Sequence, residues 1–130
     1  MDGVRTKFAE GKQLPLTIFW DNEPVGSIGL MVTREHSIGE IGYWLDKAYT
    51  GRGIMTRACN YVIRQAFEEW LLNRVEIWCG VENTPSRAIP ERLGFTREGT
   101  LRQAYWVNGA PMDVVVYAKL KDEWEQEARP

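Results

Sequence analysis

Alternating apolar and polar residues in the first half of the chain predict β-strands. Two strand-like runs, 16–20 and 25–32, are separated by the turn-forming residues 21–24, and together they predict a hairpin. A third alternating run covers residues 38–45, so its side chains should point in turn to the two faces of a sheet. The pattern therefore predicts three consecutive strands before residue 46.

From residue 53 the spacing of apolar residues changes to that of a helix. Apolar residues recur at intervals of three and four from Ile54 to Leu72, which predicts an amphipathic helix of about five turns. Residues 75–81 alternate again and predict a strand. Two strands joined by a long helical connection usually lie parallel, so we expect 38–45 and 75–81 to be parallel neighbours.

The last third of the chain predicts a short second helix and a closing hairpin. The helix should have Thr84 as its N-cap, Pro85 in the first helical position and Gly94 at its C-terminal end. Asn108 and Gly109 separate two strand-like runs and are the strongest short signal for a hairpin turn. The fold class predicted is α/β, with a mixed, mostly antiparallel sheet around a central parallel strand–helix–strand unit.

Composition and charge indicate one globular domain over residues 1–130, with 44% hydrophobic and 26% charged residues. Residues 1–13 are expected to form a partial amino-terminal helix, and 122–130 a charged tail that frays. A net charge of −2 without a Lys/Arg cluster argues against nucleic-acid binding. No apolar run approaches 18 residues, so no membrane segment is expected.

The few cysteines and the single histidine argue against a metal site and against catalysis by a histidine. Cys59 and Cys79 are isolated and lack the spacing of metal ligands, which favours a reduced, cytoplasmic setting. His36 is the only histidine in the sequence, which argues against a His-based triad and against a multi-histidine metal site. We therefore expect no bound metal.

A glycine-rich turn, YTGRGIMT, is the first candidate for a binding site. Gly51 and Gly53 follow a predicted strand and open the central helix, where unpaired backbone N–H groups and the helix dipole favour an anion. Arg52 and Arg57 add positive charge, and Thr56 adds a hydroxyl donor, so a pyrophosphate suits the turn. The spacing matches neither a dinucleotide-binding motif nor a P-loop. The alternative is that both glycines only shape a tight turn.

Four pieces of sequence in this order resemble the GNAT N-acetyltransferases, specifically their RimJ/RimL-like branch: IGYWLD, GRGIMT, NTPSRAIPERLGFTREG and the closing NG…D…Y hairpin. The resemblance covers roughly residues 14–125. It implies acetyl-CoA as co-substrate, with its pyrophosphate at the glycine turn and its pantetheine between two splayed strands, 38–45 and 75–81. The cofactor-binding residues it implies are Tyr43, Trp44, Leu45, Gly51, Arg52, Gly53, Ile54, Met55, Thr56, Asn83 and Ser86.

Two departures from the family pattern stand out. In the phosphate motif, Thr50 replaces a long-chain donor, and Met55 takes the place of a final small residue. The change at Thr50 is expected to weaken cofactor affinity. The strand and helices that normally begin the family domain are not recognised in the sequence, so we expect an amino-terminally shortened fold with an altered acceptor side.

Acetyl transfer to an amine needs a neutral amine, a donor for the oxyanion and a proton for the thiolate. Backbone N–H groups of residues 43–45 could serve the oxyanion. The family often uses a tyrosine as the acid where this chain has Pro90, and the RimL-like branch implies Ser86 instead. Glu40 is the candidate base, ahead of Glu82 and Asp46. The alternatives are a solvent-facing Glu40 and a purely structural Ser86.

The function predicted is that of an acetyl-CoA-dependent N-acetyltransferase. The acceptor would be the N-terminal amine of a protein or peptide, or a small primary amine such as a polyamine or an aminoglycoside. A non-catalytic module that binds or senses acyl-CoA is the main alternative, and a purely structural subunit is a third. An unpaired apolar edge at residues 16–20 favours association, so we expect a homodimer.

Overall fold

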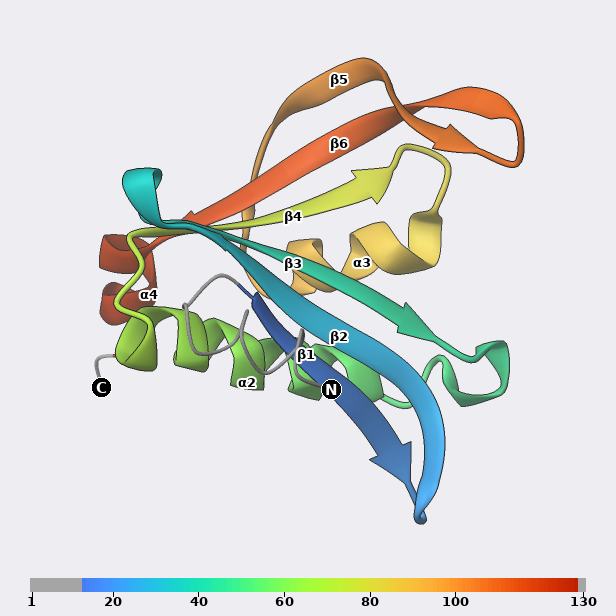
Figure 1. The fold of residues 1–130 in the computed structure, drawn as a ribbon, viewed down its shortest axis with the longest axis horizontal. Coiled ribbons are helices and arrows are strands. Elements are labelled where there is room, and N and C mark those ends of the chain that lie inside the picture. Colours follow the sequence, from blue (N-terminus) through green and yellow to red (C-terminus); the bar gives the residue numbers. More distant parts are fainter. Residues whose placement is uncertain (1–12, 129–130) are drawn as a thin grey trace.

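A computed structural model describes residues 13–128 as a six-stranded sheet with three α-helices (Figure 1). The expected helix at 1–13 falls almost entirely outside the described residues. The elements are β1 (Gln13–Trp20), β2 (Glu23–Thr33), β3 (Ile38–Leu45), α2 (Ile54–Arg64), β4 (Arg74–Gly80), α3 (Thr84–Arg92), β5 (Thr96–Val107), β6 (Ala110–Leu120) and α4 (Lys121–Ala128).

The order of the strands is β1-β2-β3-β4-β6-β5. All neighbours are antiparallel except β3 and β4, which are parallel and joined through α2. This confirms the mixed sheet, both hairpins and the central parallel unit. Alternation in the sequence was sufficient here, because each strand has a buried face and an exposed face, and that pattern also fixes the register.

The central helix is where the apolar period predicted it, but it ends earlier. α2 continues into a π-helical segment, 65–69, and Leu71 then adopts a left-handed backbone with a φ of 55°. This turn brings Leu72 into the core, fully buried, ahead of β4. Leu72 was assigned to the helix because a buried residue after a tight turn repeats the apolar spacing.

All three α-helices cover one face of the sheet (Figure 1), and the core lies between this face and the helices. The fully buried side chains include Leu30, Ile41, Val62, Ile77 and Tyr117. None of the helices in the described part of the chain is long and apolar enough to cross a membrane.

The second helix starts one residue earlier than expected. Asn83, not Thr84, is the N-cap of α3, and its side-chain oxygen accepts a hydrogen bond from the Ser86 backbone N–H at 3.2 Å. Both residues are good caps, and the amide of Asn83 reaches the third helical N–H. Gly94 follows the end of the helix in the left-handed conformation, as predicted, with a φ of 78°.

The charged tail is an ordered helix, α4, where a frayed turn was expected. The Trp124 ring packs on Phe67 with centroids 5.3 Å apart. The buried Lys119 ammonium donates to Glu127 at 2.6 Å and to the Leu93 carbonyl at 2.6 Å. These contacts fix the tail against the helical face of the sheet, which charge composition alone did not indicate.

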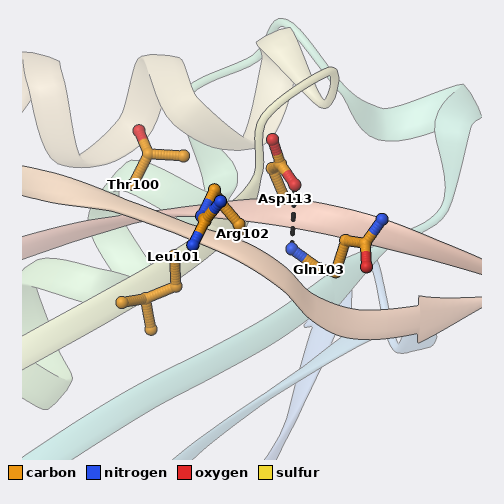
Figure 2. A pocket seen from close by; sticks show the side chains of 5 residues that line it. All are labelled: Thr100, Leu101, Arg102, Gln103 and Asp113. Carbon is orange, nitrogen blue, oxygen red and sulfur yellow. Dashed lines mark hydrogen bonds between the residues drawn. The ribbon is translucent and has the colours of Figure 1, made fainter.

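The closing hairpin turns at Asn108 and Gly109, as predicted. A bulge interrupts β5, where Gln103 has a φ of 52° and its N–H donates to the Asp113 carboxylate at 2.8 Å. A hollow of about 770 Å³ lies at this bulge. Figure 2 shows the side chains that line it, those of Thr100, Leu101, Arg102, Gln103 and Asp113. None of the residues assigned from the sequence to catalysis or cofactor binding lies there.

Candidate functional site

The two parallel strands separate part of the way along their length. Hydrogen-bonded pairing of β3 with β4 ends at Ile41 and Ile77, although β3 continues to Leu45 and β4 to Gly80. The other edge of β3 stays paired with β2 as far as Leu45. The gap therefore has unpaired backbone groups on its two walls, as the expected splay requires.

A cavity of about 870 Å³ lies at the open end of this gap. Ten of the eleven residues assigned to the cofactor line it: Tyr43, Trp44, Leu45, Gly51, Gly53, Ile54, Met55, Thr56, Asn83 and Ser86. They come from β3, the glycine turn, α2 and the start of α3. Residues far apart in the sequence thus line one cavity, where a long, flexible ligand could contact all of them.

Arg52 is the one residue of the eleven that does not line the cavity. Its guanidinium lies over the rings of Tyr49 and Trp20, 5.3 and 5.8 Å from their centroids. Attraction between the cation and these aromatic faces favours this position, in which Arg52 lies next to Tyr49 at the cavity wall.

The glycine turn has the geometry that anion binding requires. Gly51 and Gly53 have φ angles of 80° and 75°, and a Cβ placed on either would meet no atom within 4 Å. Glycine is therefore favoured by the backbone conformation, and the space beside the turn is open. The first helical bond runs from Arg57 N–H to the Gly53 carbonyl at 3.1 Å. The N–H groups of residues 54–56 precede that bond and have no acceptor in the helix.

Two cations at the cavity were missed by the sequence analysis. Arg92, in the last turn of α3, donates to the Thr56 hydroxyl at 3.2 Å, and Lys47 also lines the cavity. Lys47 lies only four residues before Gly51, so its position in the sequence could have indicated it. Arg92 comes from a separate helix, and nothing in the local pattern links it to α2.

Ser86 lies half-buried at the mouth of the gap, where it contacts Cys79 and Tyr43. Its hydroxyl donates to the Cys79 sulfur at 3.5 Å, and its carbonyl accepts from the Tyr43 hydroxyl at 2.8 Å. The Tyr43 oxygen is also 3.8 Å from the Cys79 sulfur. Burial raises the pKa of Tyr43 and the pKa of the Cys79 thiol, so both groups stay protonated at neutral pH.

Glu40 lies at the point where the strands begin to part and does not line the cavity. Burial, and secondly the charge of Glu76 on the adjacent strand, raises the pKa of Glu40. Glu76 is engaged by Arg74 at 2.7 Å and by the Trp78 indole N–H at 2.9 Å. Within residues 13–128, the Glu40 carboxyl group has no hydrogen-bond or ion-pair partner. It is thus a half-buried carboxyl with a raised proton affinity.

The remaining predicted groups are engaged otherwise or lie elsewhere. The Asp46 carboxylate accepts from the Ala48 N–H at 3.0 Å and caps a short 3₁₀ helix, 47–49. The Asn83 oxygen caps α3, which leaves its amide N–H groups for a ligand. Glu82 is exposed and outside the cavity lining. Among the described His, Cys, Asp and Glu residues, no group of three or more is placed to hold a metal.

Comparisons with known proteins agree with this architecture. Residues 2–96 match the family model for the acetyltransferase (GNAT) domain. The chain is 43% identical over 124 residues to the putative ribosomal N-acetyltransferase YdaF of Bacillus subtilis (strain 168), covering 95% of this chain and 68% of that protein. It is 37% identical over 106 residues to the ribosomal-protein-serine acetyltransferase of Escherichia coli (strain K12), covering 81% and 59%.

A solved structure shows the same fold with a ligand. RimL, a ribosomal alpha-N-protein acetyltransferase in complex with coenzyme A, superposes with a TM-score of 0.86 at 31% identity, covering 94% of this chain and 70% of that one. The chain thus spans 59–70% of the length of these three proteins. Sequence, strand topology and the shape of the parted strands lead to the same conclusion: the chain belongs to the GNAT acetyltransferase family.

Proposed function

We propose that the chain is an acetyl-CoA-dependent N-acetyltransferase that transfers the acetyl group to a primary amine. The observation that carries this proposal is the separation of β3 from β4 beyond Ile41 and Ile77, beside a cavity that ends at a helix start. Such a gap suits a thioester, because unpaired N–H groups of the strands can donate to its carbonyl oxygen while its long carrier lies in the cavity. RimL, which shares the fold, is in complex with coenzyme A.

We assign three parts of acetyl-CoA to the cavity and the gap beside it. The pyrophosphate would bind the free N–H groups of residues 54–56, assisted by Lys47 and Arg92. The pantetheine would lie between β3 and β4, within reach of Asn83. Those N–H groups of residues 43–45 that point away from β2 would bind the thioester oxygen. Arg52 has no part in this proposal.

Transfer would proceed by direct attack. The nitrogen lone pair of the amine forms a bond to the thioester carbon, and the carbon–sulfur bond breaks to release coenzyme A thiolate. Glu40 accepts the proton of the amine, directly or through a water, because its raised pKa makes it a stronger base than an exposed glutamate. Ser86 gives its proton to the thiolate and recovers one from solvent, to which Glu40 releases the proton that it accepted from the amine. Each bond formed and broken is then matched by a proton transfer.

The acceptor we favour is the N-terminal amine of a protein. The two sequence relatives and RimL are each named for ribosomal or ribosomal-protein acetylation. A small primary amine is the competing acceptor, and a panel containing both separates them.

We also propose a homodimer formed along β1. β1 is the outer strand of the sheet, and one of its edges has no strand partner among the described residues. Phe19 on this strand is 62% exposed. An unpaired strand edge beside an exposed aromatic favours association with a second copy.

Cofactor binding is tested by calorimetric titration of acetyl-CoA into Gly53→Val and a matched control, Gly109→Val. Both glycines have nearly the same positive φ, 75° and 77°, and both face open space, so valine introduces similar backbone strain at each. Only Gly53 borders the cavity. We expect Gly53→Val to abolish binding and Gly109→Val to retain it. Equal affinity in the two folded variants would contradict the assignment of the pyrophosphate to this turn.

A further inference from the structure

Pro90 leaves a backbone carbonyl of α3 without its helical partner. Proline has no N–H, so it cannot donate to the carbonyl four residues earlier, which belongs to Ser86. The Tyr43 hydroxyl takes that place, at 2.8 Å. A helical bond has thus been replaced by a bond to a different element, at the residue that we propose as the acid.

This bond crosses the gap. Tyr43 lies on β3 beyond Ile41, where β3 no longer pairs with β4, and α3 follows β4 in the chain. The Tyr43–Ser86 bond therefore connects the two walls where the backbone pairing of the strands has ended, beside the longer contact of the Tyr43 hydroxyl with the Cys79 sulfur on β4 at 3.8 Å. Because Tyr43 is on β3 and Ser86 follows β4, the bond also limits how far the gap can open.

Among the described residues, the other hydrogen bonds at the start of α3 do not reach β3. Asn83 caps the helix from within, through the Ser86 N–H. The Arg87 guanidinium donates to the Val81 carbonyl at 2.9 Å, which holds the first turn to the end of β4. Neither contact fixes the distance between Ser86 and β3, the strand whose N–H groups would bind the thioester. The Tyr43 hydroxyl supplies that constraint.

We propose that Tyr43 is a positioning residue that holds the Ser86 hydroxyl at the reacting sulfur, and that Pro90 makes this role possible by freeing the Ser86 carbonyl. The proposal rests on the function proposed above, in which Ser86 protonates the thiolate. The carbonyl and hydroxyl of Ser86 are attached to the same short residue, so a fixed carbonyl restricts the reach of the hydroxyl. Tyr43 remains a donor throughout the neutral range, because burial keeps its phenol protonated.

A double-mutant cycle between Tyr43→Phe and Ser86→Ala tests the proposal. Tyr43→Phe should lower kcat roughly 10- to 100-fold, the effect of misplacing a catalytic group by about an ångström, with little change in KM for acetyl-CoA. In the Ser86→Ala background the same change should lower kcat by less than about twofold, because there is no hydroxyl left to position. An equal loss in both backgrounds would overturn the proposal.

Tyr117→Phe is the matched control. Its hydroxyl also bonds to α3, donating to Glu91 at 2.6 Å and accepting from Arg87 at 3.1 Å, but it joins the helix to β6 rather than to β3. It should therefore change kcat far less than Tyr43→Phe. Similar losses in the two variants would mean that any loosening of α3 slows the reaction, which would contradict a specific role for Tyr43.

The substitution Pro90→Ala separates the effect of Tyr43 on the position of Ser86 from its effect on the stability of the protein. In the Tyr43→Phe variant the Ser86 carbonyl loses its partner, so Tm should fall. Adding Pro90→Ala supplies a backbone N–H to that carbonyl and should restore Tm, while kcat stays low because the bond to β3 is still missing. Recovery of kcat together with Tm would show that Tyr43 is merely structural.

The outcomes also separate this inference from the proposed function. Absence of turnover by the unmodified chain with every amine would overturn the acetyltransferase proposal. Turnover by the unmodified chain with full activity of Tyr43→Phe would overturn only the positioning role. Full activity of Ser86→Ala would remove both Ser86 and its positioning by Tyr43 from the mechanism, and acetyl transfer itself would stand.

Discussion

At the scale of single residues, Ser86 combines a weakly engaged hydroxyl donor with a backbone carbonyl that Tyr43 holds. Its hydroxyl donates to the Cys79 sulfur at 3.5 Å, a weak bond because a thiol sulfur is a poor acceptor, so the hydroxyl can exchange it for one to a ligand. We expect Ser86→Ala to lower kcat about 10²–10⁴-fold, the usual contribution of general acid catalysis, with acetyl-CoA affinity nearly unchanged. The loss should shrink with a thioester whose thiol is a better leaving group. A variant that keeps more than a third of the kcat would exclude the role.

Replacing Glu40 with glutamine should raise the stability of the protein and lower its activity. Burial raises its pKa above the ordinary value of 4.5, so the folded state binds a proton more tightly than the unfolded state does. Between the pKa of Glu40 in the unfolded state and its higher pKa in the folded state, the free energy of unfolding falls as pH rises. Above both values Glu40 is charged, and as far as this group is concerned the protein is less stable than it is at low pH with a neutral Glu40. Glu40→Gln should therefore raise Tm at pH 7.5 but hardly at pH 4, where Glu40 is largely protonated in both states.

The same variant should lose most of its turnover, because glutamine cannot accept the amine proton. Glu125→Gln, a change on the exposed side of α4, is the control and should alter neither Tm nor kcat. A Tm gain that is equal at both pH values would contradict the burial of a charged Glu40. Unchanged turnover of Glu40→Gln would show that another group, or water, accepts the proton.

The positions of individual side chains at the candidate site were harder to predict from the sequence than the helices and strands were. Gly51 and Gly53 were identified because positive φ angles restrict the choice of residue. Arg52 lies over the rings of Tyr49 and Trp20, outside the cavity lining, and no local pattern indicates this contact. Arg92 was missed because its contact with α2 exists only after α3 has packed.

At the scale of elements, the approach of α3 to the start of α2 completes the proposed anion site. Arg92→Ala should weaken acetyl-CoA binding roughly 3- to 10-fold, a modest effect because the side chain is exposed and screened. Arg97→Ala is a matched control, since Arg97 also donates to a threonine hydroxyl, on Thr100, at 3.2 Å but on β5. Binding should weaken only for Arg92→Ala, and increasingly so at low salt. Equal affinities would remove Arg92 from the site.

Elements were predicted well where one local pattern determines them. The strands follow from alternation, the β5–β6 turn from Asn108 and Gly109, and α2 from its apolar period. The bulge at Gln103 was not predicted, because it depends on a bond to Asp113 on the neighbouring strand. The separation of β3 from β4 came from the family resemblance, since no local signal marks where two strands cease to pair.

At the scale of the whole molecule, the helices lie on one face of the sheet, and β1 forms its outer edge (Figure 1). We expect a dimer in light scattering at micromolar concentrations. Phe19→Lys, which places a charge on the exposed side of β1, should shift the population towards monomer without lowering Tm. A monodisperse monomer of the unmodified chain at high concentration would contradict association through this edge.

The central claim is that acetyl-CoA bound between the parted strands gives its acetyl group to an amine. The most direct measurement follows coenzyme A thiol release and acetylated product together, by thiol titration and mass spectrometry, over a panel of N-terminal peptide amines and small primary amines. The account predicts amine-dependent release with one acetylated product per thiol, lost in Gly53→Val and kept in Gly109→Val. Acetyl-CoA binding without turnover on any amine would contradict it and identify the chain as a binding module.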